Sequence, residues 1–331
     1  MPRTGRAIHL APSRAIALAF TATVGCALLL LAVADPAQAF PGKNGRIAFY
    51  REAGQFMNDD IVSIKPQGTG DLNLTRSGHA EDTDPAYSAN GKWVTFSSQP
   101  DGADREIFKM RANGSHVRQL THNQADDLSP CFSPNGKKIV FESDRDDPVG
   151  FTTEIYKMRA NGRHQRRLTN VVGSNFDPAF SPKGDKIAFS SDRDDQVDFI
   201  EDVYVMRSNG SHTRRLTNSP GTDNEPDWSP KGNKIVFDSD RNDLVNFFSD
   251  IFVMRANGSH EHALTHTVVG DDDHAAYSPN GKKITFESDR DDQVNFNDDI
   301  FTMRPNGTHQ RSITNTADRD EDDPNWGPKP G

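Results

Sequence analysis

Short apolar stretches alternate with polar, turn-rich segments along most of the chain. One complete unit contains Asp177–Ser181, Lys186–Ser190, Val203–Arg207 and Arg214–Thr217, and Asn209-Gly210 separates the last two stretches. An Asn-Gly pair between two apolar runs is typical of a β-hairpin. The pattern therefore predicts four short strands per unit, which we call A, B, C and D in chain order.

The unit is repeated. Its Ser-Pro-x-Gly element begins at Ser133, Ser181, Ser229 and Ser278, and looser copies begin at Ser88 and Gly327. Four strands recurring at a period of about 45–49 residues are typical of the blades of a β-propeller. The copies predict an all-β protein with six four-stranded blades.

The two ends of the repeat region complement each other. Its first apolar elements, 45–49, 61–65 and 73–75, read as strands B, C and D, whereas its last element, Asp323–Trp326, reads as strand A. We expect this C-terminal strand to complete the blade begun by the N-terminal strands, because closure removes the unpaired sheet edges. An open solenoid is the alternative. The prediction is a single propeller domain over residues 40–331.

The repeat resembles a known family. The pattern Asp-x-x-Pro-x-[Trp/Phe]-Ser-Pro-x-Gly-Lys-Lys-Ile-x-Phe-x-Ser-Asp-Arg-Asp, followed by Asp-Ile-Phe-x-Met-Arg-x-Asn-Gly-Ser and Arg-Leu-Thr, is similar to the TolB-type, WD-like propeller repeat. It is visible over Asn175–Thr217 and Asp223–Thr265. The resemblance implies the propeller fold but no particular function, because one fold carries many functions.

The first 39 residues have the pattern of a secretory signal. Residues 1–14 carry three arginines and no acid, an apolar run follows from Ala15 to Ala34, and Ala37 and Ala39 fit a cleavage site before Phe40. The alternative is an uncleaved membrane anchor. Cleavage would leave a chain without a transmembrane segment, exported to the periplasm or the medium.

Composition excludes several other classes of protein. The 20 Phe residues argue against disorder, although only 34% of the 331 residues are hydrophobic. A net charge of −10 argues against nucleic acid as a partner. Two cysteines are too few for a disulfide scaffold or a Cys-based zinc module. We expect Cys131 to be a small core residue of a strand.

Charge is distributed unevenly between the two ends of the predicted ring. Most acids fall in the D–A and B–C loops, whereas lysines and arginines crowd the A–B and C–D turns. Acids at the start of strand A are expected to meet around the central channel, where they would bind a cation and then a protein or peptide segment, preferably a basic one. The predicted channel-mouth residues are Asp84, Asp127, Asp177, Glu225, Asp273, His274 and Asp323.

Four B–C loops share the template Asp-Arg-Asp-Asp-x-Val-x-Phe-x-x-Asp, seen from Asp192 to Asp202. Clustered carboxylates are the hard oxygen ligands that Ca²⁺ prefers, so these loops are candidate calcium sites. Alternatively, the loop arginine bridges the acid that opens strand C, and the first Asp caps its own turn. The Val-x-Phe pairs are expected to pin the loops to the ring, with an apolar binding collar as the alternative. The candidate ligands are Asp144, Asp146, Glu154, Asp192, Asp194, Asp202, Asp240, Asp250, Asp289, Asp291 and Asp299.

These observations favour an exported, non-catalytic scaffold that binds through its acidic end, and no catalytic residue is assigned. The alternative is a calcium-dependent hydrolase or lyase of the kind seen in lactonase propellers, with a metal site that starts from Asp273 and His274. A third interpretation places the basic end on anionic polymers of the cell envelope.

Overall fold

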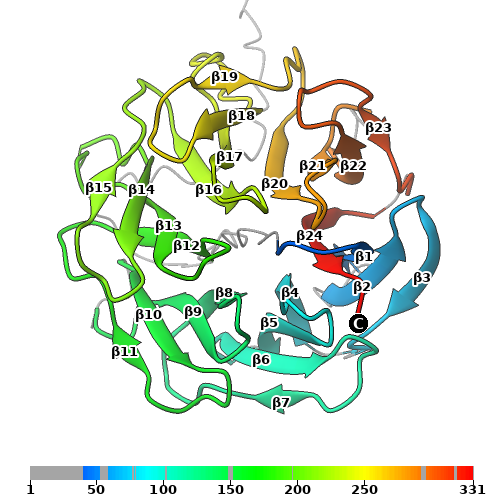
Figure 1. Ribbon diagram of the computed structural model, residues 1–331, viewed down its shortest axis with the longest axis vertical. Coiled ribbons are helices and arrows are strands. Elements are labelled where there is room, and N and C mark those ends of the chain that lie inside the picture. The colour runs from blue at the N-terminus through cyan, green and yellow to red at the C-terminus, as the bar shows by residue number, and fades with distance from the viewer. Residues whose placement is uncertain are drawn as a thin grey trace, which may run out of the picture. The chain divides into compact units, whose positions relative to one another are not determined.

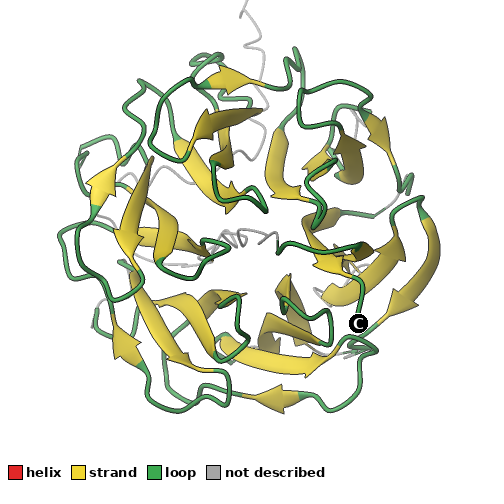
Figure 2. Ribbon diagram, in the orientation of Figure 1, coloured by secondary structure: helices red, strands yellow, loops and turns green. Residues whose placement is uncertain are grey.

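The computed structural model describes residues 40–52, 59–76, 78, 80–100, 103–147, 152–195, 197–291, 296–316 and 319–330. All of them lie in one compact unit, Val33–Gly331. This part of the chain consists of strands and loops without a helix (Figure 2). It also contains no helix able to cross a membrane. The predicted signal peptide, residues 1–39, lies outside the described residues.

Six four-stranded sheets are arranged as blades around a common centre (Figure 1). Within each blade the strands pair antiparallel, and the sheet order runs outward from strand A to strand D. The predicted six-bladed propeller is therefore confirmed. We number the blades from the one that contains the N-terminal strands.

The strands of each blade are given from the inside outward. Blade 1 contains β24 (Glu321–Pro328), β1 (Asn44–Glu52), β2 (Asp59–Lys65) and β3 (Thr69–Asn73); blade 2 contains β4 (Ala80–Tyr87), β5 (Trp93–Pro100), β6 (Glu106–Arg111) and β7 (Arg118–Gln119); blade 3 contains β8 (Asp127–Phe132), β9 (Lys138–Ser143), β10 (Glu154–Arg159) and β11 (Arg166–Arg167). Blade 4 contains β12 (Asn175–Phe180), β13 (Lys186–Ser191), β14 (Asp202–Arg207) and β15 (Arg214–Arg215); blade 5 contains β16 (Asp223–Trp228), β17 (Lys234–Ser239), β18 (Asp250–Arg255) and β19 (His262–Ala263); blade 6 contains β20 (Asp272–Tyr277), β21 (Ile284–Ser288), β22 (Asp299–Met303) and β23 (Arg311–Ser312).

Ring closure follows the predicted scheme. The C-terminal strand β24 pairs antiparallel with β1, and Trp326 lies opposite Ile47. Both side chains are fully buried. The last strand of the chain thus provides the innermost strand of the first blade.

The hydrophobic core lies between neighbouring blades. One cluster joins Cys131 and Val140 of blade 3 to Phe180, Phe189 and Tyr204 of blade 4. Both faces of β13 are therefore covered, which explains why its residues from Ile187 onward are all buried. Cys131 is a free thiol in this core, as expected.

Five of the outermost strands, β7, β11, β15, β19 and β23, are shorter than predicted and pair over two residues each. In blade 1 the outermost strand β3 covers Thr69–Asn73 and not the predicted 73–75. After each short strand D, a threonine side chain accepts a hydrogen bond from the backbone of strand C in place of a further backbone–backbone bond. The Val203 amide donates to Thr217 Oγ1 at 2.9 Å, and the Ile107 amide donates to Thr121 Oγ1 at 2.8 Å. The recurring Leu-Thr dipeptide therefore satisfies a backbone donor at the start of strand C.

Candidate functional site

The innermost strand of every blade is interrupted by a bulge. In β16, for example, the pairing register with β17 shifts between Asn224 and Asp227. One non-glycine residue in each bulge has a positive φ, which is unfavourable for an L-residue and must be held by its surroundings. We call these six residues the axial ring, since their strands lie nearest the centre in Figure 1: Asp84, Ser129, Asp177, Glu225, His274 and Asp323.

Hydrogen bonds connect the axial ring from blade to blade. The Asp84 amide donates to Asp323 Oδ2 at 3.3 Å, and the Ser129 amide donates to Asp84 Oδ2 at 3.4 Å. The Ser129 hydroxyl in turn donates to Asp177 Oδ1 at 3.5 Å. Residues far apart in the sequence are thereby fixed side by side.

The other half of the ring completes the circuit. The Ser190 hydroxyl donates to Asp177 Oδ2 at 3.4 Å and accepts the Glu225 amide at 3.1 Å. The His274 amide donates to Glu225 Oε2 at 3.1 Å, and His274 Nε2 lies 3.4 Å from Asp323 Oδ1. Every member of the ring is buried.

A second layer of side chains supports the ring from strand B. Glu142 Oε2 accepts the Asp177 amide at 2.9 Å, and Glu287 Oε2 accepts the Asp323 amide at 2.7 Å. Each glutamate therefore stabilises the bulge of the next blade. The corresponding strand-B positions around the ring are Tyr50, Ser97, Glu142, Ser190, Asp238 and Glu287.

His274 is the basic member of the axial ring. Its Nδ1 contacts Glu287, and its Nε2 lies 2.9 Å from Glu225 Oε1. Burial alone lowers the pKa of His274, but the negative charges of Glu225, Glu287 and Asp323 outweigh burial and raise this pKa well above its ordinary value. The ring therefore contains one basic side chain among several acids.

The carboxyl groups of the ring are poorly neutralised. Burial raises the pKa of Asp84, Asp177 and Asp323, and the neighbouring acid Glu287 raises that of Asp323 further. Among the described residues, nothing donates a hydrogen bond to Oδ1 of Asp84 or to Oδ1 of Asp323. Both atoms are buried, and an electropositive partner would compensate the cost of burying them.

Two groups of side chains in the described part of the chain have the spacing of metal ligands. Ligand atoms of His274, Glu287 and Asp323 lie within 4.8 Å of one another, and so do those of Glu287, Asp298 and Asp322. Glu287 belongs to both groups. A divalent cation coordinated by one imidazole and carboxylates fits the first group chemically, and an all-oxygen site fits the second.

Two predicted channel-mouth residues lie outside the axial ring. Asp127 accepts hydrogen bonds at 2.6 and 2.7 Å from Arg145 Nη2, and Ser129 occupies the ring position of its blade. Asp273 precedes the ring residue His274. The ring residue is the third residue of β8 and of β20, as it is in β12, β16 and β24. The predicted Asp127 and Asp273 are acids that lie two residues and one residue before it. Asp84, Asp177, Glu225, His274 and Asp323 are ring members as predicted.

The loop arginines form a second, outer set of contacts. Arg241 Nε lies 3.1 Å from Asp223 Oδ1, at the start of strand A in its own blade. The guanidinium also lies over the Phe252 ring, 4.8 Å from its centroid. We call these arginine contacts with strand A the outer pairs. They are Arg51–Glu321, Arg145–Asp127, Arg193–Asn175, Arg241–Asp223 and Arg290–Asp272.

The predicted bridge from the loop arginine to the acid that opens strand C is therefore wrong. Glu154 and Asp202, which open β10 and β14, pair instead with Arg167 and Arg215 of strand D. The strand-D arginine is the neighbour in the ladder and reaches the acid directly.

The first Asp of the template also differs from expectation. The carboxylate of Asp192 accepts the Ser174 amide at 2.6 Å, and that of Asp240 accepts the Thr222 amide at 2.7 Å. The donors belong to the D–A loop rather than to the aspartate's own turn. Asp144 and Asp289 make the same contact with the amides of Asp126 and Asp271. This carboxylate therefore ties two loops of one blade together.

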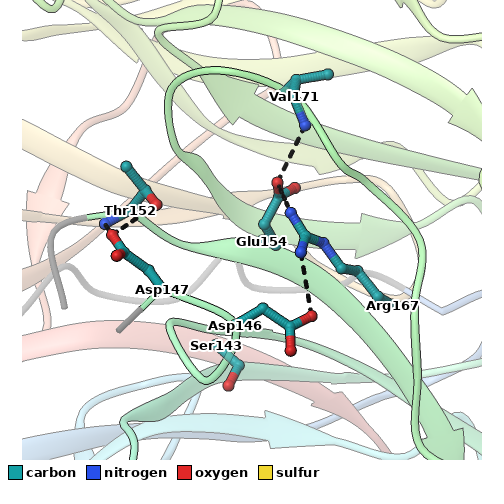
Figure 3. Close-up of a pocket in the computed structure, with 7 residues that line it drawn as sticks. All are labelled: Ser143, Asp146, Asp147, Thr152, Glu154, Arg167 and Val171. Carbon is teal, nitrogen blue, oxygen red and sulfur yellow. Dashed lines mark hydrogen bonds and ion pairs between the residues drawn. The ribbon is translucent and has the colours of Figure 1, made fainter. Parts of the chain in front are cut away.

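Figure 3 shows the template acids of blade 3 around a cavity of about 160 Å³. The Arg167 guanidinium lies between Asp146 and Glu154, and Glu154 Oε1 also accepts the Val171 amide at 3.1 Å. The corresponding Asp194, Asp250 and Asp299 contact Tyr204, Thr267 and Thr314. These carboxylates have internal donors, and none of them belongs to the two groups with metal-ligand spacing. Calcium binding by the loops stays a prediction, including for Asp291.

The Val-x-Phe pairs do not pin the loops to the ring where the structure describes them. Val197 is 82% exposed and Phe199 is 50% exposed, and Val245 and Phe247 are similar. Phe199, Phe247 and Phe296 also have positive φ values of 58°, 62° and 58°. Val149, Phe151 and Val294 lie outside the described residues.

Sequence reasoning missed Glu142, Glu287, Asp298 and Asp322. A signal was present for two of them. Glu142 and Glu287 directly follow the buried Phe141 and Phe286 in strand B, where a charged residue interrupts a fully buried run. Asp298 and Asp322 carry no such mark, because they lie in acidic segments with many similar residues.

The sequence matches two family descriptions that fit this geometry. Residues 56–171 match the TolB beta propeller domain, and residues 149–266 match the Tricorn protease N-terminal beta propeller domain. The chain is a TolB-like β-propeller. No curated protein matches the sequence.

Solved structures share the fold of this TolB-like propeller. TolB from Acinetobacter baumannii is 21% identical with a TM-score of 0.73, over 88% of this chain and 68% of that chain. The putative TolB from Agrobacterium tumefaciens is 18% identical with a TM-score of 0.61, over 86% and 99%. An oligogalacturonate lyase in complex with manganese is 12% identical with a TM-score of 0.50, over 82% and 74%. At these identities the likeness concerns the fold.

Proposed function

We propose that this TolB-like propeller is an exported, non-catalytic binding scaffold whose axial ring takes a cation or a cationic side chain of a protein segment. The proposal rests on the excess of acidic over basic side chains in the ring. Glu225, Glu287 and Asp323 contact the single imidazole of His274, and the ring holds two further buried acids, Asp84 and Asp177. A cationic group at the ring would offset this excess of buried acid.

The cost of burying carboxylates explains why a cation would bind here. Removing an ionised carboxylate from water is unfavourable unless a charge or hydrogen bonds compensate. In the ring, Asp84 Oδ1 and Asp323 Oδ1 accept no hydrogen bond from the described residues. A bound cation would stabilise the ionised carboxylates and lower their raised pKa values.

The exposed loop residues indicate what kind of partner would carry the cation. An Asx-type turn holds two of these loops. The amides of Val197 and Asp198 both donate to Asp195 Oδ1, and those of Val245 and Asn246 donate to Asp243 Oδ1. The turn presents Val197 and Phe199 to solvent among acidic residues. Exposed aromatics in a strained backbone are favoured at interfaces. A protein segment with both basic and apolar side chains matches this surface.

A peptide titration tests the proposal. The probes are a labelled peptide of alternating Lys and Phe and its Glu–Phe counterpart, measured by fluorescence anisotropy with residues 40–331. We expect saturable binding of the basic peptide alone, weakened by salt. Asp84→Asn combined with Asp323→Asn should reduce binding at least tenfold, and Phe199→Ser should reduce it less. The exposed Val268→Ser on a D–A loop is the control. Equal binding of both peptides would reject the proposal.

A metal-dependent hydrolase or lyase is the second candidate function. The group of His274, Glu287 and Asp323 favours it, because an imidazole with carboxylates can hold a catalytic divalent ion. A lyase propeller of similar fold is known in complex with manganese. Turnover of a lactone or of oligogalacturonate with Mn²⁺ or Ca²⁺, abolished in His274→Ala, would establish this function in place of the scaffold.

A further inference from the structure

A small basic cavity lies between blades 3 and 4, at the end of the ring opposite the acidic loops. Its volume is about 140 Å³, enough for several water molecules of about 30 Å³ each. The A–B turns and strands of two blades form it. The lining residues that matter are Ser133, Lys138 and Lys157 of blade 3 and Phe180, Lys183 and Ser208 of blade 4.

The repeats show that this seam differs from the others. Three positions define it: the start of strand B, the middle of strand C, and the A–B turn of the next blade. At the seam of blades 3 and 4 all three are lysines, namely Lys138, Lys157 and Lys183. The equivalent triplets are Trp93, Lys109 and Asn135 at the previous seam, and Lys186, Val205 and Lys231 at the following one. The later seams have Lys234, Val253 and Asn280, and then Lys283, Thr302 and Lys329. The seam of blades 1 and 2 has Arg46, Ser63 and Asn90.

Lys157 is the buried member of the triplet. It is 4% exposed, and its ammonium donates to the backbone carbonyl of Ser208 in the neighbouring blade. An ammonium has three donors, so two remain for other acceptors. Burial first, and then the positive charges of Arg166 and Lys138, lower the pKa of Lys157 to about 8. The site therefore concentrates positive charge without a carboxylate among its lining residues.

At the seam of blades 2 and 3 an aromatic side chain replaces one of the lysines. The Lys109 ammonium lies 5.0 Å from the centroid of the Trp93 ring and donates to the carbonyl of Ala160. Lys109 thus makes the same contact between blades as Lys157 but has an indole beside it instead of Lys138. The contact itself can serve stability, and Lys138 and Lys183 add two further lysines to the lining of the cavity.

We propose that the cavity formed by Lys138, Lys157 and Lys183 binds a compact oxyanion, namely a phosphate group. Lysine ammoniums bind phosphate as point charges, and a partly buried site strengthens that attraction. The Ser133 hydroxyl at the cavity already donates to Asn135 Oδ1 at 3.0 Å, so the three lysines would recognise the phosphate. The site is separate from the axial ring and does not depend on the proposed function.

Titration with inorganic phosphate by calorimetry and by ³¹P NMR tests this site in the protein of residues 40–331. We expect one saturable site in the wild type. Lys157→Met should weaken phosphate binding at least tenfold, and the exposed Lys183→Asn, which copies Asn135 of blade 3, should weaken it several-fold. Lys109→Met and Lys231→Asn are the matched controls and should bind as the wild type does.

The pH dependence adds a second readout. Bound phosphate favours the charged ammonium, so affinity should fall as the pH rises above about 8. A glycerol-phosphate polymer, titrated separately, shows whether the phosphate of an envelope polymer binds as free phosphate does. Absence of binding at millimolar phosphate, or equal loss of binding in Lys109→Met and Lys157→Met, would overturn the proposal. Lys183→Asn keeps the test valid if Lys157→Met does not fold.

Discussion

The outer pairs and the axial ring both contain buried acids, but they are neutralised very differently. Asp223 in the outer set contacts the Arg241 guanidinium through both of its oxygens. Asp323 in the axial ring has the shared imidazole of His274 as its cationic neighbour, at 3.4 Å. Asp223 opens β16 and Asp323 is the third residue of β24, so the same residue type, two positions apart in equivalent strands of two blades, has a guanidinium partner in one case and a shared imidazole in the other. The density of acidic residues in the sequence therefore does not distinguish an outer acid from a ring acid.

The largest expected effect comes from breaking an outer pair. Arg241→Met leaves Asp223, whose side chain is 0% exposed, without its guanidinium. Loss of one partner of a buried ion pair costs about 3–5 kcal/mol in unfolding free energy, so the thermal midpoint should fall by several degrees.

Blade 4 provides the control for this experiment. Arg193 occupies the same loop position, but its strand-A partner is the neutral Asn175. Arg193→Met leaves no buried charge and should cost less than Arg241→Met. Adding Asp223→Asn to Arg241→Met should recover part of the loss. Equal midpoints for the two arginine variants would show that packing over the aromatic rings, and not charge, stabilises the outer pairs.

A divalent cation should raise the stability of the axial ring. A ligand that binds only the folded state contributes about 2.7 kcal/mol at a hundredfold excess over its Kd. A thermal melt with EDTA, and then with Ca²⁺ or Mn²⁺ added back, measures this rise. If the ring holds the ion, Asp323→Asn removes the rise and Asp194→Asn preserves it. The reverse result would assign the ion to the loops, as the sequence predicts.

The pH dependence of stability reports on acids that belong to neither set. Burial, followed by the charges of Glu81 and Glu52, raises the pKa of Asp59 to about 7, and burial raises that of Glu106 to about 7. Acids with raised pKa values bind more protons in the folded state than in the unfolded state. Stability should therefore fall as the pH rises from about 4 through about 7.

Thermal melts between about pH 5 and pH 8 measure this trend, with a midpoint lower by a few degrees at the upper end. Asp59→Asn should flatten the curve, because the amide does not titrate. His274 contributes in the same direction, since its raised pKa makes its stabilisation decline at high pH. A midpoint that increases toward pH 8 would contradict the raised pKa values.

The fold could be predicted from the sequence because its signals are local. The turns at Asn209-Gly210 and Ser181–Gly184 mark strand ends, and the leftover strand Asp323–Trp326 indicates the closure. The axial ring was predictable only in part. In blade 3 the ring residue is Ser129 and not Asp127, and an alignment of the repeats on the proline that follows the ring position would have found it. The positive φ of the ring residues and the hydrogen bonds between them depend on contacts between blades and could not be predicted. The partner of each arginine likewise depends on contacts between loops distant in sequence.

The smallest expected effect concerns a template acid at the cavity in Figure 3. The Asp146 side chain is 49% exposed and its partner Arg167 is 29% exposed. An exposed ion pair contributes less than about 1 kcal/mol, so Asp146→Asn should lower the thermal midpoint only slightly. Glu154→Gln should cost more, because its 5% exposed side chain accepts from both Arg167 and the Val171 amide. If Asp146→Asn instead removed the stabilisation by Ca²⁺, this surface carboxylate would be one of the ligands of the ion. The contrast between outer acids that are neutralised by arginine and ring acids that remain available to a cation would then not hold in blade 3.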